Sequence, residues 1–132
     1  MKVTLDTNVL VRLITDDDPV QGKLARKLAA GAELIAMPLP ALVEMCWVLE
    51  RAYDFPKSDV ARALRALINA DNAATDFPAV EAGLSLLDAG GDFADGVIAH
   101  DGQWLGGETF LSFDKKAVRI LQESGHAARI PQ

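Results

Sequence analysis

The chain opens on the stretch Met1-Lys2-Val3-Thr4-Leu5-Asp6-Thr7-Asn8-Val9-Leu10. Its first half is the short apolar run of a β-strand, which ends at Asp6, and a helix is expected from about Asn8. A strand that leads directly into a helix is the beginning of a βαβ unit, in which the strands are parallel and the helices cover the sheet.

The same alternation of short strands and longer helices continues along the 132 residues. Asp18 and Pro19, for example, have the character of an N-cap and a first helical residue. The pattern predicts an α/β fold, a three-layer α/β/α sandwich with a short, mostly parallel central sheet, in one domain over residues 1–132. Strands are expected at residues 2–6, 33–37, 73–77, 108–113 and 127–130, and helices from residue 8 and at 18–30, 38–53, 57–70, 78–88, 92–105 and 114–124.

The net charge of −6 and the single cysteine narrow the class of protein. Phosphate contacts require Lys and Arg, so a nucleic-acid partner is disfavoured by charge. Two bound divalent ions would offset about four negative charges, so the net charge does not exclude a nucleic-acid partner.

No apolar run approaches the roughly 18–20 residues that span a bilayer, and no export signal is evident. We therefore expect no membrane partner and a cytoplasmic location, where Cys46 would stay reduced.

Four acids lie in apolar surroundings that disfavour a charge: Asp6, Glu44, Asp95 and Asp114. Asp6 and Asp114 each follow an apolar strand, at the edge where open α/β sheets bind ligands. Glu44 is the only charge between Ile35 and Leu49, and Asp95 lies in the first turn of a helix. Burying a polar group without a partner costs roughly 2–7 kcal/mol. A bound divalent cation is the simplest explanation for all four acids.

Each acid also has an ordinary structural explanation. Asp6 and Asp114 would cap the helices that follow them, and Asp92 with Asp95 has the spacing of a capping box. Glu44 has no capping role in the middle of an apolar helix, so its alternative is a buried ion pair. The partner in that ion pair would be Arg12 or Arg51.

Three further side chains follow the apolar spacing of helices and are expected in the core: Cys46, Trp47 and Trp104. Cys46 is therefore not expected to be a nucleophile. Neither a zinc-binding spacing nor a glycine-rich phosphate loop is present.

The acids and their neighbours resemble the PIN-domain ribonucleases, in particular the VapC-type toxins of toxin–antitoxin pairs. The resemblance covers nearly the whole chain, and Gly96 departs from it, since a larger residue such as Ala is common there. That departure is expected to affect packing rather than chemistry. The resemblance rests on four segments: Leu5-Asp6-Thr7-Asn8-Val9-Leu10, Leu42-Val43-Glu44 with Trp47-Val48-Leu49, Asp92-Phe93-Ala94-Asp95 followed by Val97-Ile98-Ala99, and Thr109-Phe110-Leu111-Ser112-Phe113-Asp114.

The resemblance implies a metal-dependent endoribonuclease that acts as a toxin. Three groups of site residues follow from it: the catalytic and metal-binding acids Asp6, Glu44, Asp95 and Asp114; the supporting residues Asn8, Asp92 and Ser112; and the RNA-contacting residues Lys115, Lys116 and Arg119. Carboxylates without His or Cys suit Mg²⁺ or Mn²⁺, which would hold the scissile phosphate and activate water. The products would carry a 5′-phosphate and a 3′-hydroxyl.

The resemblance also implies two protein partners, a cognate antitoxin and a second copy of the chain in a homodimer. Exposed apolar residues on the second and fourth expected helices would serve such contacts. Which RNA is cut, and whether single-stranded DNA is also cut, does not follow from the sequence.

Two other interpretations stay open at this point. Phosphatases with an Asp nucleophile and phospho-accepting receiver domains also place an Asp after their first strand. They usually need a Lys after an apolar strand, and Lys115 comes one residue too late. The phosphatases also use a second Asp where this chain has Asn8. The remaining alternative is a non-catalytic PIN-like binding module, against which the presence of all four acids argues.

Overall fold

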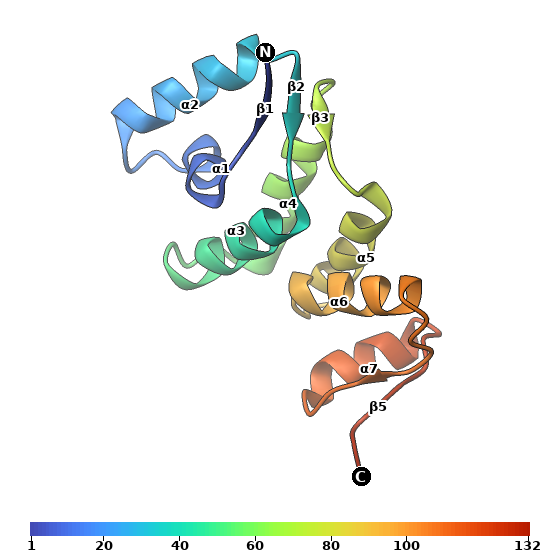
Figure 1. Ribbon diagram of the computed structural model, residues 1–132. Coiled ribbons are helices and arrows are strands. Elements are labelled where there is room, and N and C mark those ends of the chain that lie inside the picture. The colour runs from blue at the N-terminus through green and yellow to red at the C-terminus, as the bar shows by residue number, and fades with distance from the viewer. The chain divides into compact units, whose positions relative to one another are not determined.

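Seven helices and five short strands alternate along the chain in the computed structural model, which describes residues 1–132 (Figure 1). Asp18 caps the second helix as predicted, because its Oδ1 accepts a hydrogen bond from the Gln21 amide at 3.0 Å and Pro19 is the first helical residue. In chain order the elements are β1 (Lys2–Thr4), α1 (Thr7–Ile14), α2 (Pro19–Gly31), β2 (Leu34–Ala36), α3 (Leu39–Arg51), α4 (Lys57–Ile68), β3 (Ala73–Ala74), α5 (Phe77–Asp88), α6 (Phe93–Trp104), β4 (Phe110–Leu111), α7 (Lys115–Glu123) and β5 (Ala128–Arg129).

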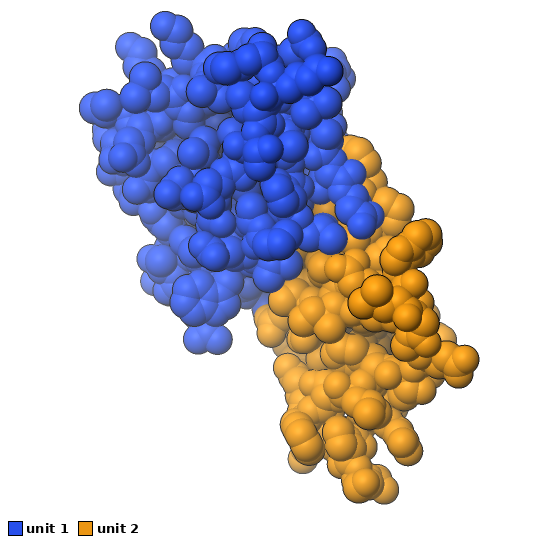
Figure 2. All heavy atoms as spheres, in the orientation of Figure 1, with its two compact units in different colours: residues 1–76 blue, residues 77–132 orange.

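The chain divides into two compact units, Met1–Asp76 (unit 1) and Phe77–Gln132 (unit 2), which Figure 2 shows in different colours. Unit 1 contains a three-stranded sheet in the order β1-β2-β3, and unit 2 contains the pair β4-β5. Every strand pair is parallel, as the alternation of strands and helices predicts.

The strands are shorter than the sequence predicts, but their hydrogen bonds extend beyond the assigned residues. After β1, the Leu5 amide donates to the carbonyl of Ala36 at 3.1 Å. After β4, the Ser112 amide donates to the carbonyl of Arg129 at 3.3 Å. Each strand therefore continues, loosely paired, to within two residues of the acid that follows it.

In unit 1, α1 packs against α2 and α3, and α3 packs against α4. The core contains fully buried leucines from three of these helices: Leu10, Leu42, Leu49 and Leu64. The prediction from its apolar sequence that α3 is buried on nearly all sides is wrong, because Glu44 and Trp47 are exposed. Trp47 is 59% exposed, and Trp104 at the end of α6 is 86% exposed, so neither tryptophan belongs to the core. Apolar spacing in a helix does not distinguish a core residue from an exposed one at the margin of the apolar face.

The expected exposure of apolar residues is confirmed for one helix and wrong for another. Val20, Leu24 and Leu28 of α2 are exposed and follow one another at intervals of four residues. The apolar residues of α4 are instead buried in the core of unit 1: Val60, Leu64 and Ile68. No helix of the structure combines the length and the apolar character needed to cross a membrane.

In unit 2, α5 and α6 cross at two glycines, Gly83 and Gly96. A Cβ atom at Gly96 would lie 2.7 Å from the Cα of Gly83 and would also meet the carbonyl oxygen of Ala82. A Cβ atom at Gly83 would overlap the ring of Phe93, which is 1% exposed. The backbones can approach this closely only because neither residue has a side chain. The departure from the family pattern at Gly96 is therefore a packing feature, as expected.

Replacing Gly96 with Ala is expected to lower the free energy of unfolding by about 1–3 kcal/mol, because the added methyl meets backbone atoms that cannot move aside. Gly102→Ala is the matched control on the same helix, since no atom lies within 4 Å of its added Cβ. That variant should be more stable by about 0.4–1 kcal/mol. Urea unfolding of both variants tests the pair, and equal stabilities would contradict the close crossing.

Cys46 lies in the core of unit 1 and is expected to be chemically inert. Burial, followed by the nearby charge of Glu50, raises the pKa of its thiol to about 12. At pH 8 only about one thiol in ten thousand would be ionised. A disulfide reagent such as DTNB should label the folded protein only at the rate of unfolding, and label the urea-unfolded protein at once. Rapid labelling of the folded protein would show that Cys46 is accessible.

Candidate metal centre

In unit 1, two of the candidate acids, Asp6 and Glu44, open into one cavity of about 240 Å³ between α1 and α3. Asn8, the proposed supporting residue in the first turn of α1, lines the same cavity. We call this cavity the α1–α3 pocket; it is lined by Asp6, Thr7, Asn8, Val11, Arg12, Glu44, Val48 and Tyr53.

Asp6 both caps helix α1 and presents a carboxylate to the α1–α3 pocket. It has extended backbone angles, its Oδ1 accepts from the Thr7 amide at 2.7 Å, and its carbonyl accepts from the Val9 and Leu10 amides. Only one carboxylate oxygen takes part in the cap, and a carboxylate offers about four lone-pair sites. Capping and ligand binding are therefore compatible in this residue.

Glu44 is exposed at the α1–α3 pocket rather than buried in an apolar helix. The alternative of a buried ion pair is wrong, because no ion pair joins Glu44 to Arg12 or Arg51. The guanidinium of Arg12 is bound to Asp17 instead, at 3.0 Å. Glu44 reaches the pocket because α3 packs beside α1, the arrangement that its candidate role requires.

In unit 2, three carboxylates converge on one point: those of Asp92, Asp95 and Asp114, with one oxygen of each within 4.8 Å of the others. Asp95 is half-buried, and the other two side chains are exposed. The cluster includes Asp92, which the sequence placed only in a supporting role. Carboxylates at this separation repel one another, and a divalent cation with oxygen ligands would remove that repulsion.

Helix α7 begins at the cluster, and Asp114 is its N-cap. Its Oδ1 accepts from the amides of Lys116 at 3.0 Å and Ala117 at 3.1 Å, which is the capping role considered from the sequence. The Asp114 amide in turn donates to Oγ of Ser112 at 3.0 Å. Ser112 thus holds the loop that presents Asp114.

Helix α6 also begins at the cluster, but its N-cap differs from the expected capping box. Asp92 has N-cap backbone angles, yet its side chain makes no capping hydrogen bond. The amide of Asp95 donates to the carbonyl of Asp92 at 3.2 Å. The Asp92 carboxylate thus does not cap α6, and helix capping does not explain the presence of an acid at this position.

The predicted RNA-contacting residues lie on α7 directly after Asp114. Lys115 and Lys116 are exposed in its first turn. Arg119 is also exposed, and its guanidinium lies 4.0 Å from the carboxylate of Glu123, which is a solvent-accessible and therefore weak ion pair.

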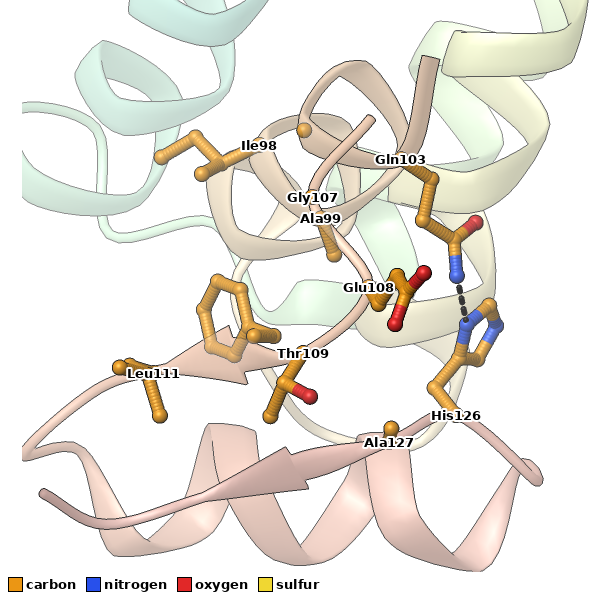
Figure 3. A pocket seen from close by; sticks show the side chains of 11 residues that line it. Ile98, Ala99, Gln103, Gly107, Glu108, Thr109, Leu111, His126 and Ala127 are labelled. Atoms are coloured by element: carbon orange, nitrogen blue, oxygen red, sulfur yellow. Dashed lines mark hydrogen bonds between the residues drawn. The ribbon is translucent and has the colours of Figure 1, made fainter. Parts of the chain in front are cut away.

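A separate cavity in unit 2 contains none of the candidate acids. It has a volume of about 170 Å³, and Gln103 and His126 form a hydrogen bond of 3.0 Å across one side of it, with Glu108 close by (Figure 3). Its lining residues come from α6, the loop between α6 and β4, β4 itself and the turn before β5, so it is distinct from the carboxylate cluster of unit 2.

Among the residues of the α1–α3 pocket that were not predicted in functional roles are Arg12 and Tyr53. Arg12 was considered only as a partner of Glu44. Its actual partners are Asp17, Gln21 and Tyr53, which are 5, 9 and 41 positions away in the sequence. No local pattern in the sequence indicates the contact with Tyr53.

The comparison with known families identifies the class of protein. Residues 3–121 match the PIN domain family, so the chain belongs to that family and has the predicted α/β/α fold class. The comparison with curated proteins found no match. PIN domains are typically metal-dependent nucleases that bind divalent cations, and the carboxylates of Asp92, Asp95 and Asp114 fit such a cation in number, charge and chemistry.

Asp114→Asn is expected to weaken metal binding at least about tenfold while preserving the fold, because Asn retains the capping oxygen but not the charge. Asp114→Ala should also lower the free energy of unfolding by about 1 kcal/mol, since it loses the cap. Titration calorimetry with Mn²⁺ and with Mg²⁺ measures the affinity. Asp101→Asn, on α6 outside the cluster, is the control. Unchanged affinity in Asp114→Asn would exclude Asp114 as a ligand.

Proposed function

We propose that this protein is an Mg²⁺- or Mn²⁺-dependent endoribonuclease that acts as the toxin of a toxin–antitoxin pair. The observation that carries the proposal is the convergence of Asp92, Asp95 and Asp114 within 4.8 Å in a chain of the PIN domain family. Hard carboxylate oxygens, with neither His nor Cys in the cluster, favour these two ions over zinc.

The proposal assigns all four predicted acids to the same reaction, and residues 1–132 to one functional domain. Asp6 and Glu44 belong to unit 1, and Asp95 and Asp114 belong to unit 2. The match of a single family across both units supports this assignment. Asn8, Asp92 and Ser112 would act beside the acids, as their places in the α1–α3 pocket and around the carboxylate cluster suggest.

The chemistry requires little of the protein beyond binding and orientation. When bound, the cation supplies Lewis acidity for the scissile phosphate and for an attacking water. The carboxylates hold that cation, and the helix caps at Asp6 and Asp114 fix the direction of two of them. Lys115, Lys116 and Arg119 would contact the RNA backbone, which positions the substrate without reading its sequence. No side-chain nucleophile is needed, in agreement with the buried, protonated Cys46.

The proposed partners are a cognate antitoxin and a second copy of the chain. The exposed apolar stripe of α2 (Val20, Leu24 and Leu28) supports a protein contact, since it leaves large apolar side chains in water. A cytoplasmic location accords with a single free cysteine, Cys46.

Cleavage of total cellular RNA and of single-stranded DNA by the purified, antitoxin-free chain tests the nuclease. We expect discrete RNA products with 5′-phosphates in Mg²⁺ or Mn²⁺. EDTA, Asp95→Asn and Glu44→Gln should each reduce the rate at least about a hundredfold, because the metal provides several kcal/mol of transition-state stabilisation. The control variant Asp101→Asn should retain activity.

Three outcomes would change the proposal. Equal cleavage by Asp95→Asn would point to a contaminating nuclease. Loss of activity in Asp95→Asn but not in Glu44→Gln would remove the acids of unit 1 from the reaction. No cleavage by folded, metal-loaded protein would favour a non-catalytic binding module. Growth arrest on expression in bacteria, absent in Asp95→Asn, tests the toxin role separately.

A further inference from the structure

Arg12 is the one cationic side chain that lines the α1–α3 pocket together with Asp6 and Glu44. It lies one turn after Asn8 on the same face of α1 and about 9 Å along the helix axis from Asp6. Its side chain is 24% exposed, so a ligand in solvent can reach it. Since it forms no ion pair with Glu44, its charge is not used to neutralise the acids of the pocket.

The guanidinium of Arg12 is held by three side chains. Its Nε donates to Oε1 of Gln21 at 2.8 Å, and its Nη1 donates to Oδ1 of Asp17 at 3.0 Å and to the hydroxyl of Tyr53 at 3.1 Å. Tyr53 completes the network by donating its hydroxyl proton to Oδ2 of Asp17 at 2.7 Å. The hydrogen bond with Tyr53 raises the pKa of Arg12 and lowers the pKa of Asp17, so both groups keep their charges at neutral pH.

Tyr53 is itself fixed by the turn that follows α3. Asp54 adopts a left-handed backbone conformation with φ 55°, and the Phe55 amide donates to the carbonyl of Leu49 at 3.0 Å. The rings of Tyr53 and Phe55 pack edge to face with centroids 6.4 Å apart. The tyrosine hydroxyl therefore has a defined position from which it orients Arg12.

The hydrogen bonds leave part of the guanidinium available. Arg has five N–H donors. The donor on Nε and the two on Nη1 are used, whereas no protein acceptor binds the two donors on Nη2. A planar, permanently charged group with free paired donors is suited to an oxyanion such as phosphate. The pre-formed network reduces the entropy that the side chain loses when it binds.

We propose that Arg12 binds a backbone phosphate of the RNA beside the α1–α3 pocket, with Asp17 and Tyr53 as positioning residues for its guanidinium. This inference rests on the proposed ribonuclease function and adds a substrate contact that lies outside the acids and α7. A phosphate contact holds the strand in register without reading bases, so its loss weakens binding for RNAs of every sequence.

Arg12→Gln is expected to raise KM for a short single-stranded RNA about fivefold while kcat changes less than about twofold. The slope of log KM against log salt concentration should fall by about 0.7, the contribution of one phosphate contact in a single strand. Arg12→Lys should restore part of the affinity and the salt slope, because it restores the charge but not the planar donors. Tyr53→Phe should raise KM about twofold.

The matched control is Arg62→Gln. Arg62 is also bound to an aspartate, Asp59, at 3.1 Å, but it lies on the exposed surface of α4 outside the α1–α3 pocket. This variant should retain the KM and the salt slope of the natural protein. Thermal unfolding of every variant shows whether it is folded, and Tyr53→Phe and Arg12→Lys provide the test if Arg12→Gln does not fold.

Binding of the same fluorescein-labelled RNA, measured by anisotropy in EDTA, separates recognition from metal chemistry. If the natural protein cleaves RNA but Arg12→Gln changes KM, RNA affinity and salt slope no more than Arg62→Gln does, Arg12 has only a structural role and the inference is wrong. If the natural protein neither binds nor cleaves RNA, the ribonuclease proposal itself fails, and the role of Arg12 fails with it.

Discussion

The fold of unit 2 has to hold three carboxylates close together against their mutual electrostatic repulsion. Asp92, Asp95 and Asp114 hold oxygens within 4.8 Å of one another, a separation at which two negative charges repel by about 1 kcal/mol in water. The N-termini of α6 and α7 meet there, and the dipole of each helix favours a negative charge by about 0.3–1 kcal/mol. Beneath the cluster, the glycine crossing of α5 and α6 and the buried ring of Phe93 fix the direction of α6.

Helix capping and metal binding look like competing explanations in the sequence, but the geometry of Asp6 and Asp114 is compatible with both. Asp6 and Asp114 each use one carboxylate oxygen to cap a helix, and the cap holds the side chain in one orientation. A ligand that is already oriented loses less entropy when a cation binds. Asp92 differs from these two residues, because it occupies the N-cap position of α6 but its side chain accepts no capping hydrogen bond.

The helices, the parallel pairing of the strands and the places of Asp6, Asp95 and Asp114 at helix starts were all predictable, because they follow from local periodicity and capping preferences. The exposure of Glu44, Trp47 and Trp104 was not, since it depends on which side of a helix its neighbours cover. The network of Arg12 escaped prediction for the same reason. Its contact with Tyr53 joins residues 41 positions apart, and no local sequence pattern predicts a contact over that separation.

The amino-acid sequence was sufficient to predict the order of the elements, the PIN domain family and the candidate acids, because each of these follows from short segments of sequence. Which of these groups lie close together became known from the three-dimensional structure. It brought Asp92 into the cluster with Asp95 and Asp114, set Asp6 and Glu44 in one pocket, and turned Arg12 toward Asp17 and Tyr53. These residues come together through helix packing. Van der Waals contact between segments distant in the sequence sets the packing geometry, and the local sequence pattern does not.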